Sequence, residues 1–555
     1  MNNLFRKKTI QPQIADNIHA PHSMKKVLRV RDLTMMGIAA VIGAGIFSTI
    51  GTAAYNGGPG VILLFVITAV ACGLTALCYA EFASRVPVSG SAYTYSYVTF
   101  GELIAWIIGW SLILEYSIGN IVVAISWSAY FSNLLEAFHL YLPEYLRVGY
   151  QTAYNSYLHA VENNLPTDLL TWSNAPTLLG VPFIINLPAF IIVVFVTLIA
   201  YIGISESKTG ANIMVLLKIA ILIFIAVLGF WIIFSENKTD NWSPFLPNGM
   251  KGVFQGVSAV FFAYIGFDAI STTAEECENP QRDLPRGMIY SLLICTIIYV
   301  IITLVITGLV NYSELEGVAD PLAYVFNVIG MSQVGLFISV IAVVASTSVL
   351  LVFQVGQPRI WMSMSRDGLL PSIFGKLNKK SKVPGFATII TGLIVGLPAL
   401  FIDELLMTDL TSIGTLFAFI LVCGGVLMLP VLPEKKGFKL PYINGKWIVM
   451  SIMLLLLILF RDRIHIIIVN FEHINAQEIL FILFLLIGIS LAVITFLKRL
   501  TLIPVLGILS CLYLMVEIPA NSWFVFLSWM VLGLIMYFLY SRKHSVIYLQ
   551  TKNGK

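Results

Sequence analysis

Glycines and hydroxyl side chains interrupt the first apolar run of the sequence. Gly43-Ala44-Gly45 is followed closely by Ser48 and Thr49. Glycine weakens a helix, so we expect the chain to unwind locally at this point. An unwound turn leaves backbone N–H groups without helical partners at the start of the next half-helix, where they attract a carboxylate. The stretch therefore predicts a binding site for a carboxylate.

A second interruption lies in another apolar run, from Phe261 to Thr272. Gly266 and Asp268 follow Phe262-Ala263-Tyr264-Ile265 there. Carbonyls freed at Phe262, Ala263 and Ile265 would accept hydrogen bonds from an ammonium group. Broken helices in matching positions of two repeated halves are the best sequence indication of a transporter site. Together the two breaks predict a receptor for a zwitterion, if the first ten apolar runs form two inverted repeats of five.

Three ionisable residues, Lys218, Glu115 and Asp268, lie deep in apolar runs. Each costs a few kcal/mol at membrane depth unless it faces a cavity or a partner, so each is a functional candidate. Burial favours the neutral amine of a lysine, and we expect Lys218 to bind and release a proton. For Glu115 and Asp268, a structural ion pair or helix cap remains an equal alternative.

The composition indicates which elements position these residues. The chain has 555 residues, of which 58% are hydrophobic and 11% charged, and its mean hydropathy is +0.89. Soluble domains carry about 25% charged residues. Apolar runs of roughly 20 residues are long enough to cross a bilayer as helices, and they recur from residue 34 to 540. We therefore expect an all-α polytopic membrane protein in a lipid bilayer.

We place about fourteen transmembrane helices, and the run 447–460 is short for a span. The expected spans are 34–55, 59–83, 102–131, 181–204, 210–235, 252–273, 287–311, 332–356, 384–402, 409–431, 447–460, 477–497, 502–518 and 521–541. They divide the chain into an N-terminal tail (1–33), a ten-span transport core (34–431), four additional C-terminal spans (432–541) and a C-terminal tail (542–555).

The distribution of basic residues orients these spans. Of the 33 Lys and Arg, the outer loops hold only Arg147, Lys238, Lys251, Arg461 and Arg463 when the N-terminus is placed inside. Cytoplasmic loops carry the excess of Lys and Arg in membrane proteins. We therefore expect a multi-pass protein of the cell (inner or plasma) membrane with both termini in the cytoplasm.

Several classes of function fit poorly. The longest polar connection, about residues 132–180, is too short for a soluble catalytic domain, and the seven His residues are scattered. We therefore expect no enzyme, no cofactor and no metal site. The six Cys residues lack metal-like spacing and are expected to be apolar core residues. A formal net charge of only +4 argues against a nucleic-acid partner.

Longer motifs add a resemblance to a known family. The stretch Gly43 to Phe47 resembles the first-span motif of the amino acid-polyamine-organocation (APC) superfamily. Further strings resemble its cationic amino acid transporter branch in the bacterial form. They are Tyr79-Ala-Glu-Phe-Ala-Ser-Arg-Val-Pro-Val-Ser-Gly-Ser-Ala-Tyr93, Phe261 to Asp268, Glu275 to Arg286, Gly356-Gln-Pro-Arg359 and Met364 to Pro371. Residues 447–497 look like two extra spans relative to twelve-span bacterial members.

The resemblance implies a LeuT-like fold of five plus five inverted repeats with additional C-terminal helices, and substrate near the midplane. It implies that Lys218 occupies the place of sodium in sodium-coupled relatives and couples transport to a proton. Phe262 would also act as a gate, and Ser346 and Thr347 could face the substrate side chain. The substrate-binding residues carried over are Ile42, Gly43, Ala44, Gly45 and Ile46 for the carboxylate, and Phe262, Ala263 and Ile265 for the ammonium.

The leading hypothesis is a secondary active permease, a proton symporter for cationic or broad-range L-amino acids that works by alternating access. An exchanger of amino acids or amines on the same fold is the first alternative. An amino acid sensor that does not transport is a remote one. The sequence leaves the amino acid, the stoichiometry and the oligomeric state open.

Overall fold

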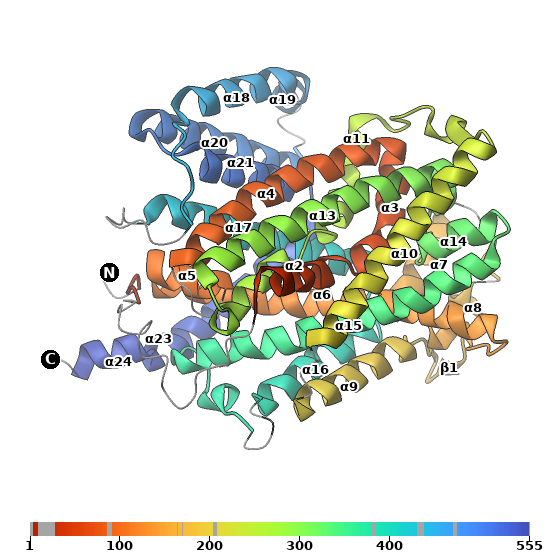
Figure 1. Ribbon diagram of the computed structural model, residues 1–555, viewed down its shortest axis with the longest axis horizontal. Coiled ribbons are helices and arrows are strands. Elements are labelled where there is room, and N and C mark those ends of the chain that lie inside the picture. The colour runs from red at the N-terminus through yellow and green to blue at the C-terminus, as the bar shows by residue number, and fades with distance from the viewer. Residues whose placement is uncertain are drawn as a thin grey trace.

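The computed structural model is built almost entirely from helices, most of which run side by side along one long axis (Figure 1). It describes residues 4–8, 28–85, 91–163, 165–168, 170–203, 208–378, 381, 383–429, 438–469 and 474–553. Most of the predicted N-terminal tail (9–27) and residues 86–90 of one family-like motif lie outside the described residues.

The first expected span is a broken helix, as the glycines predict. The first half, α2 (Val30–Val41), ends at Ile42, whose backbone is extended at φ −77° and ψ 90°. A π-helical turn, Gly45–Thr49, leads into the second half, α3 (Ile50–Gly57). The second span, α4 (Val61–Arg85), follows after one short turn. The interruption lies inside the protein, where every residue from 38 to 51 is buried.

The sixth expected span is also broken. It begins as α11 (Gly249–Gln255) and α12 (Val257–Phe262), which are bent by 45° relative to each other. The chain then passes through Gly266 at φ 113°, a left-handed conformation that glycine adopts without strain. A 3-10 helical segment, Phe267–Glu276, completes the span. Both predicted interruptions are therefore confirmed.

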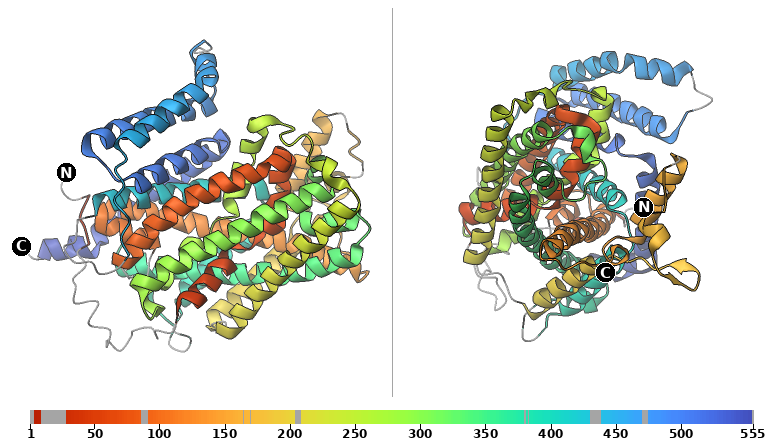
Figure 2. Two further views of the ribbon diagram at one scale, coloured as in Figure 1. Left: turned by 45° about the horizontal axis from the view of Figure 1, so that its top comes forward. Right: turned by 90° about the vertical axis from the view of Figure 1, so that its right-hand side faces the viewer.

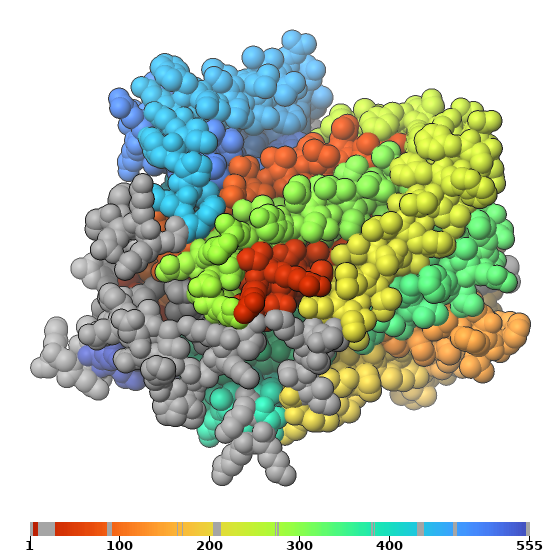
Figure 3. All heavy atoms as spheres, viewed as in Figure 1, coloured from red at the N-terminus to blue at the C-terminus, as the bar shows by residue number. Residues whose placement is uncertain are grey.

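Long continuous helices surround the two broken ones. The third expected span, α6 (Glu102–Ala137), runs near the centre of the bundle with other helices around it (Figure 2, right), and it packs along α15 (Ser332–Arg366). The seventh span, α13 (Pro280–Leu309), packs against α4 and α2. On the face shown in Figure 3, α2 lies between α13 and α10 (Lys208–Ser235).

Shorter elements complete the first 430 residues. The helices are α5 (Ser91–Thr99), α7 (Tyr150–Glu162), α8 (Thr171–Asn174), α9 (Leu187–Ile202), α14 (Pro321–Val328), α16 (Gly385–Ala399) and α17 (Glu404–Met428). A two-stranded antiparallel hairpin, β1 (Thr177–Leu178) and β2 (Val181–Pro182), lies in the connection between α8 and α9. The helix α17 packs against α6, α4 and α5, so it joins the two halves of the bundle.

The C-terminal part adds helices to one side of the bundle. The first three, α18 (Lys446–Leu459), α19 (Arg461–Val469) and α20 (Ala476–Lys498), lie at its edge (Figure 1) and reach the core through α21 (Leu502–Val516), which packs on α17 and α4. The last helices are α22 (Ala520–Met536), α23 (Arg542–His544) and α24 (Val546–Asn553). The described residues of this region therefore pack at one edge of the bundle, and their identity as two extra spans relative to twelve-span members stays a prediction.

The membrane character of the chain is clear from its helices, although their number as spans stays a prediction. Eight helices of the described residues are long and apolar enough to cross a membrane, or nine if the bent pair α11–α12 is included. Four shorter apolar helices, α9, α16, α18 and α21, add to these. All six cysteines are buried thiols, as expected.

Candidate functional site

The first break leaves two backbone N–H groups without hydrogen-bond acceptors. The Ile42 N–H still bonds to the Ile38 carbonyl at 2.8 Å, and the Gly43 carbonyl accepts from Ile46 and Phe47, both at 3.2 Å. By contrast, the N–H groups of Gly43 and Ala44 donate to no acceptor among the described residues. Buried backbone donors are almost always paired. Two adjacent donors in this state, at the start of a half-helix, suit an anionic ligand.

The second break leaves two backbone carbonyls without hydrogen-bond donors. The Phe262 carbonyl accepts from the Ile265 N–H at 3.1 Å, which closes a tight turn. The carbonyls of Ala263 and Ile265 accept no hydrogen bond from any residue that the structure describes. Of the three carbonyls expected to bind an ammonium, two therefore keep both lone pairs available.

Glycine lets the two breaks touch backbone to backbone. A Cβ atom on Gly45 would lie 2.3 Å from Cα of Ala263, and one on Gly266 would lie 3.0 Å from the Ala40 backbone. The Thr49 hydroxyl reinforces this contact, because it lies 3.0 Å from the Ala259 carbonyl. Gly45 therefore serves first to bring spans one and six together.

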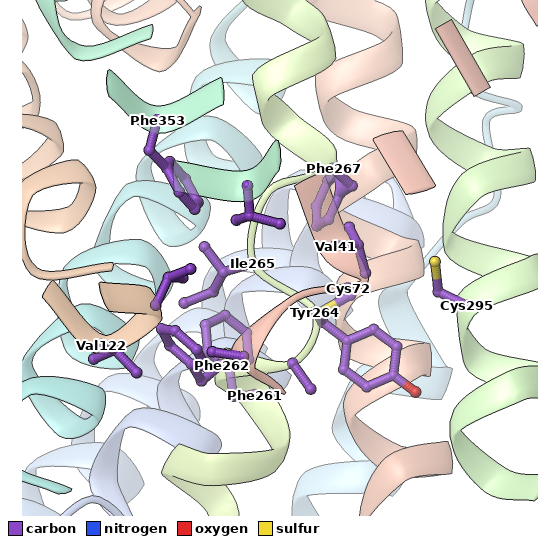
Figure 4. Close-up of a cluster of buried hydrophobic side chains, with 14 of the residues drawn as sticks. Val41, Cys72, Val122, Phe261, Phe262, Tyr264, Ile265, Phe267, Cys295 and Phe353 are labelled. Carbon is purple, nitrogen blue, oxygen red and sulfur yellow. The ribbon is translucent and has the colours of Figure 1, made fainter. Parts of the chain in front are cut away.

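A small cavity lies where the breaks meet. Its free volume is about 10 Å³, room for roughly one water molecule, and its lining side chains are apolar and buried. The ring of Phe262 and the side chains of Ile265 and Phe353 lie close together there (Figure 4). The lining residues are Ala40, Val41, Gly43, Ala44, Gly45, Val123, Phe262, Ile265, Val349 and Phe353.

The predicted binding residues fall into two groups. Gly43, Ala44, Gly45, Phe262 and Ile265 line the cavity. The others flank it, and all are buried: Ile42, Ile46 and Ala263. The substrate is expected to bind the backbone groups of these residues, so their side chains need not face the cavity. Phe262 lies at the cavity wall, and its role as a gate stays a prediction.

Lys218 reaches the first break from α10. Its side chain is 1% exposed, and its ammonium donates to the carbonyls of Ala39 at 3.2 Å and Ile42 at 3.0 Å. These carbonyls belong to the C-terminal end of α2, where the helix dipole favours a cation. The ammonium therefore caps the half-helix directly before the unpaired N–H groups.

The two candidates on α15 are placed beside the cavity rather than in it. Thr347 accepts from the Trp127 indole at 2.9 Å and donates to the Val343 carbonyl at 2.7 Å, and Ser346 is fully buried. Val349 and Phe353 line the cavity instead. They follow Ser346 by three and seven residues, so the helical period could have indicated them.

Glu115 and Asp268 lie together on another side of the breaks. Each of the two residues is only 2% exposed. The two carboxyl groups are close enough for their charges to interact. One carboxylate oxygen of each has no hydrogen-bond partner among the described residues. Neither lines the cavity. Among the residues that the structure describes, no three His, Cys, Asp or Glu side chains come close enough to bind a metal ion.

Comparison with known proteins assigns the family. A model described as amino acid permease matches residues 28–491, and one described as the C-terminus of AA_permease matches residues 500–545. The chain belongs to the amino acid permease family. The predicted resemblance to the APC superfamily is thereby confirmed.

Three relatives show the range of the family. The branched-chain amino acid permease BcaP of Bacillus subtilis is 39% identical over 98% of each chain. The methylthioribose transporter of the same organism is 36% identical over 99% of this chain and 100% of its own. The vacuolar cationic amino acid transporter 2 of Arabidopsis thaliana is 38% identical over 79% of this chain and 64% of its own. All three are transporters by name.

A solved structure confirms the fold. The crystal structure of MhsT in complex with L-phenylalanine matches with a TM-score of 0.51 at 13% identity, over 73% of this chain and 90% of that one. At 13% identity, the match is evidence for the fold alone. The predicted LeuT-like fold, with its two broken helices, is therefore confirmed.

Proposed function

We propose that this permease is a secondary active transporter that carries L-amino acids with apolar side chains by alternating access. The observation that carries the proposal is the cavity at the two breaks, which combines unpaired backbone donors and acceptors with an apolar wall. The backbone groups suit the carboxylate and ammonium of any amino acid. The wall then selects the side chain.

The lining favours apolar over cationic substrates. A buried cationic side chain needs an opposite charge or several acceptors, and the lining residues carry no acidic group. Valine, leucine and isoleucine need only apolar contacts such as Val123, Val349 and Phe353 offer. The relative named as a branched-chain permease agrees with this choice, whereas the family resemblance alone favoured cationic amino acids.

An uncharged thioether sugar is the second candidate. One relative is named as a methylthioribose transporter and matches over nearly the whole chain. A methylthio group would fit the apolar wall, while the unpaired N–H groups and carbonyls would meet hydroxyls instead of charged groups. Such a substrate carries neither a carboxylate nor an ammonium group, so the backbone N–H groups and carbonyls would not bind the charged groups that suit them.

We further propose that Lys218 carries the coupling proton and that the transporter is a symporter of the cell membrane, not an enzyme. Both termini would then lie in the cytoplasm, and residues 34–431 would form the ten-span transport core. The ammonium of Lys218 touches span one directly, so its charge state would affect the conformation at the break. An exchanger, and a sensor without transport, remain the alternatives.

Counterflow into proteoliposomes tests these assignments together. Vesicles loaded with unlabelled leucine should accumulate labelled leucine, isoleucine and valine, whereas labelled arginine and lysine should stay at background. Accumulation of methylthioribose in place of leucine would support the second candidate. Uptake that requires an internal counter-substrate, even with a proton gradient, would support an exchanger. Saturable binding without any flux would support a sensor.

A further inference from the structure

A short hairpin projects from the bundle at the end opposite to both termini. Its strands β1 (Thr177–Leu178) and β2 (Val181–Pro182) pair antiparallel, and β1 lies at the far end of the molecule from the two chain ends (Figure 1). In the view along the bundle, the hairpin reaches sideways beyond the helices (Figure 2, right). Residues 183–186 connect it directly to α9. The chain therefore fixes the hairpin beside the first turn of that span.

The tip of the hairpin holds a leucine in an unfavourable backbone conformation. Leu179 has φ 55° and Gly180 has φ 81°, as in a two-residue turn whose central residues are both left-handed. Glycine adopts this conformation freely and asparagine adopts it readily, whereas a bulky apolar residue is strained there. The tip thus carries a large apolar side chain at a position that suits a small polar one.

The apolar side chains of the hairpin are also exposed. Leu179 is 99% exposed, Leu178 is 64% exposed and Val181 is 52% exposed. A Cβ atom added to Gly180 would meet nothing within 4 Å. Removal of such side chains from water is favourable. An apolar environment outside the chain would therefore offset the strain at the tip.

The base of the hairpin is held on three spans. The Asn186 side chain caps α9 through the Ala189 N–H at 3.2 Å and accepts from the Ser128 hydroxyl of α6 at 2.6 Å. The Asn186 N–H donates to the Leu400 carbonyl, at the end of α16, at 2.9 Å. These bonds fix the height of the hairpin relative to α6, α9 and α16.

The span that follows the hairpin is short. The 16 residues of α9 extend for about 24 Å, less than the hydrocarbon thickness of about 30 Å. At helical spacing, α9 exposes apolar side chains of the kind that lipid covers: Ile191, Phe195, Leu198 and Ile202. The apolar band of this span therefore needs further residues beyond the helix.

The hairpin continues the apolar surface of α9. Phe183, which joins the two elements, is 39% exposed. No charged residue occurs between Asp168 and Glu206, so the hairpin, the connection and α9 form one uncharged segment. A charged side chain within this segment would oppose its burial in hydrocarbon. A span shorter than the hydrocarbon must thin the bilayer or use its flanking residues, and here the flanking residues are apolar.

Aromatic rings indicate where the membrane surface lies. Trp172 of α8, shortly before the hairpin, packs on Tyr150 and Tyr154 of α7, with ring centroids 5.0 Å and 4.8 Å apart. Tryptophan and tyrosine concentrate at the membrane–water interface. Another face of α7 carries the exposed polar side chains of Asn155 and His159. The arrangement suits a loop that has lipid on one side and water on the other.

We propose that the hairpin 177–182 inserts its tip into the lipid leaflet at this end of the bundle and completes the apolar band of α9. Leu178 and Leu179 would contact the acyl chains, and the absence of charge in the segment makes the contact independent of the lipid headgroup. The proposed function implies that this leaflet is the outer one. The lipid contact itself does not depend on substrate or coupling.

A second copy of the chain is the other occupant to consider. A stable interface buries about 800 Å² on each partner, which is far more than a hairpin with two strands of two residues can offer. Continuity with the exposed face of α9 favours lipid instead, because that face meets the bilayer along the whole span.

Fluorescence quenching locates the tip in the full-length protein. The native cysteines are buried, so Leu179→Cys provides an exposed thiol for the environment-sensitive dye NBD, and the unsubstituted protein measures background labelling. In phosphatidylcholine liposomes, we expect a nitroxide on the acyl chains to remove most of the NBD emission and aqueous iodide to leave it unchanged. Asn155→Cys, on the polar face of α7, is the matched control and should show the reverse.

The other outcomes of this experiment overturn the proposal. Quenching of the label at position 179 by iodide and not by the nitroxide would place the tip in water. Protection from both quenchers would place it against protein, such as a second copy of the chain. Neither result bears on transport, so the proposed function would stand or fall separately.

A substitution at the tip separates lipid contact from backbone strain. Asparagine suits the left-handed conformation better than leucine, so Leu179→Asn relieves strain in any environment. We nonetheless expect this variant to unfold at a lower temperature than wild type in bilayers of long-chain lipid, with a smaller difference in short-chain lipid, because the apolar band of α9 is then incomplete. Leu179→Met should match wild type in both. An unchanged or higher unfolding temperature of Leu179→Asn in the thick bilayer would overturn the proposal.

Discussion

The ammonium of Lys218 lies 3.0 Å from the carbonyl oxygen of Ile42, the residue at which α2 stops being helical. The next two residues carry the unpaired N–H groups of the proposed carboxylate receptor. A change in the charge of Lys218 would therefore act one residue away from the proposed substrate site. This short connection provides a physical basis for coupling between proton and substrate.

Lys218→Ala should abolish uptake driven by an inward proton gradient. The substitution removes the proton site and leaves the carbonyls of Ala39 and Ile42 without their donor, which costs about 1–3 kcal/mol of stability. Proton-driven leucine uptake in proteoliposomes measures the effect, and Lys251→Ala, at an exposed lysine, is the control. Full-rate uptake in a correctly inserted Lys218→Ala protein would exclude the mechanism and make Glu115 and Asp268 the next candidates.

Wild-type uptake should be insensitive to the replacement of sodium by choline. The reason is that the Lys218 ammonium already supplies a fixed cation beside the break in span one. Initial rates of leucine uptake in the two media, at one ionic strength and pH, provide the measurement. A rate that falls to background in choline would show that sodium is the coupling ion.

Gly43→Ala should weaken leucine binding, whereas Gly45→Ala should lower stability. An added methyl at Gly45 meets backbone atoms of Ala263 at 2.3 Å, whereas one at Gly43 meets a methyl of Val349 at 3.0 Å. We expect Gly45→Ala to lower stability by about 1–3 kcal/mol and Gly43→Ala to fold normally but bind leucine more weakly. Thermal unfolding and leucine binding together distinguish them. Equal stability of the two variants would contradict the backbone contact.

A partner substitution sharpens this comparison. Val349→Ala removes the methyl group that the new Cβ at Gly43 approaches, so it should restore part of the leucine affinity of Gly43→Ala. It should not rescue Gly45→Ala, because Val349 is not among the nearest neighbours of that site. Rescue of both variants by Val349→Ala would show that the two glycines share one packing role.

Removal of either charged group from the substrate should nearly abolish affinity. Hydrogen bonds to charged groups contribute about 1.5–3 kcal/mol each, so isoamylamine and 4-methylpentanoate should compete with labelled leucine at least tenfold less well than leucine. Competition in counterflow provides the measurement. If isoamylamine competes as well as leucine, the backbone N–H groups of span one do not bind a carboxylate.

Val349→Ala should change the selectivity of the transporter. The substitution enlarges the cavity at its side-chain end, and we expect the preference for phenylalanine over leucine to rise about tenfold. Val340→Ala is the matched control, because Val340 is on the same helix but 39% exposed on its outer surface. An unchanged preference in Val349→Ala would mean that the substrate side chain points elsewhere.

The sequence predicts the breaks because they depend on local chemistry. Glycine pairs within an apolar run weaken a helix wherever they occur, and the position of Lys218 within its run already places its ammonium at membrane depth. The motifs that resemble the APC superfamily also predict the fold. For these reasons the all-helical architecture and the half-helices at Gly43 and Gly266 could be predicted from residues alone.

The apolar wall of the cavity could not be predicted in the same way. Val123 and Val349 look like ordinary residues of apolar helices, and only the packing of α6 against α15 brings them to the breaks. Ser346 and Thr347 are distinct in the sequence because they are polar residues in an apolar run, although their hydroxyls lie beside the cavity. The hydrogen bonds of Lys8 with Asp367 and of Ser545 with Glu102 join residues more than 350 positions apart, which no local pattern encodes.

The uncharged wall of the cavity has an electrical consequence. A zwitterionic substrate brings no net charge, so one proton per cycle makes uptake electrogenic by one elementary charge. A membrane potential of 100 mV contributes about 2.3 kcal/mol to the movement of that charge. This energy alone corresponds to a gradient of roughly fiftyfold in amino acid concentration. If the wall selects leucine over arginine, as we propose, the same wall would thus allow the membrane voltage to concentrate leucine.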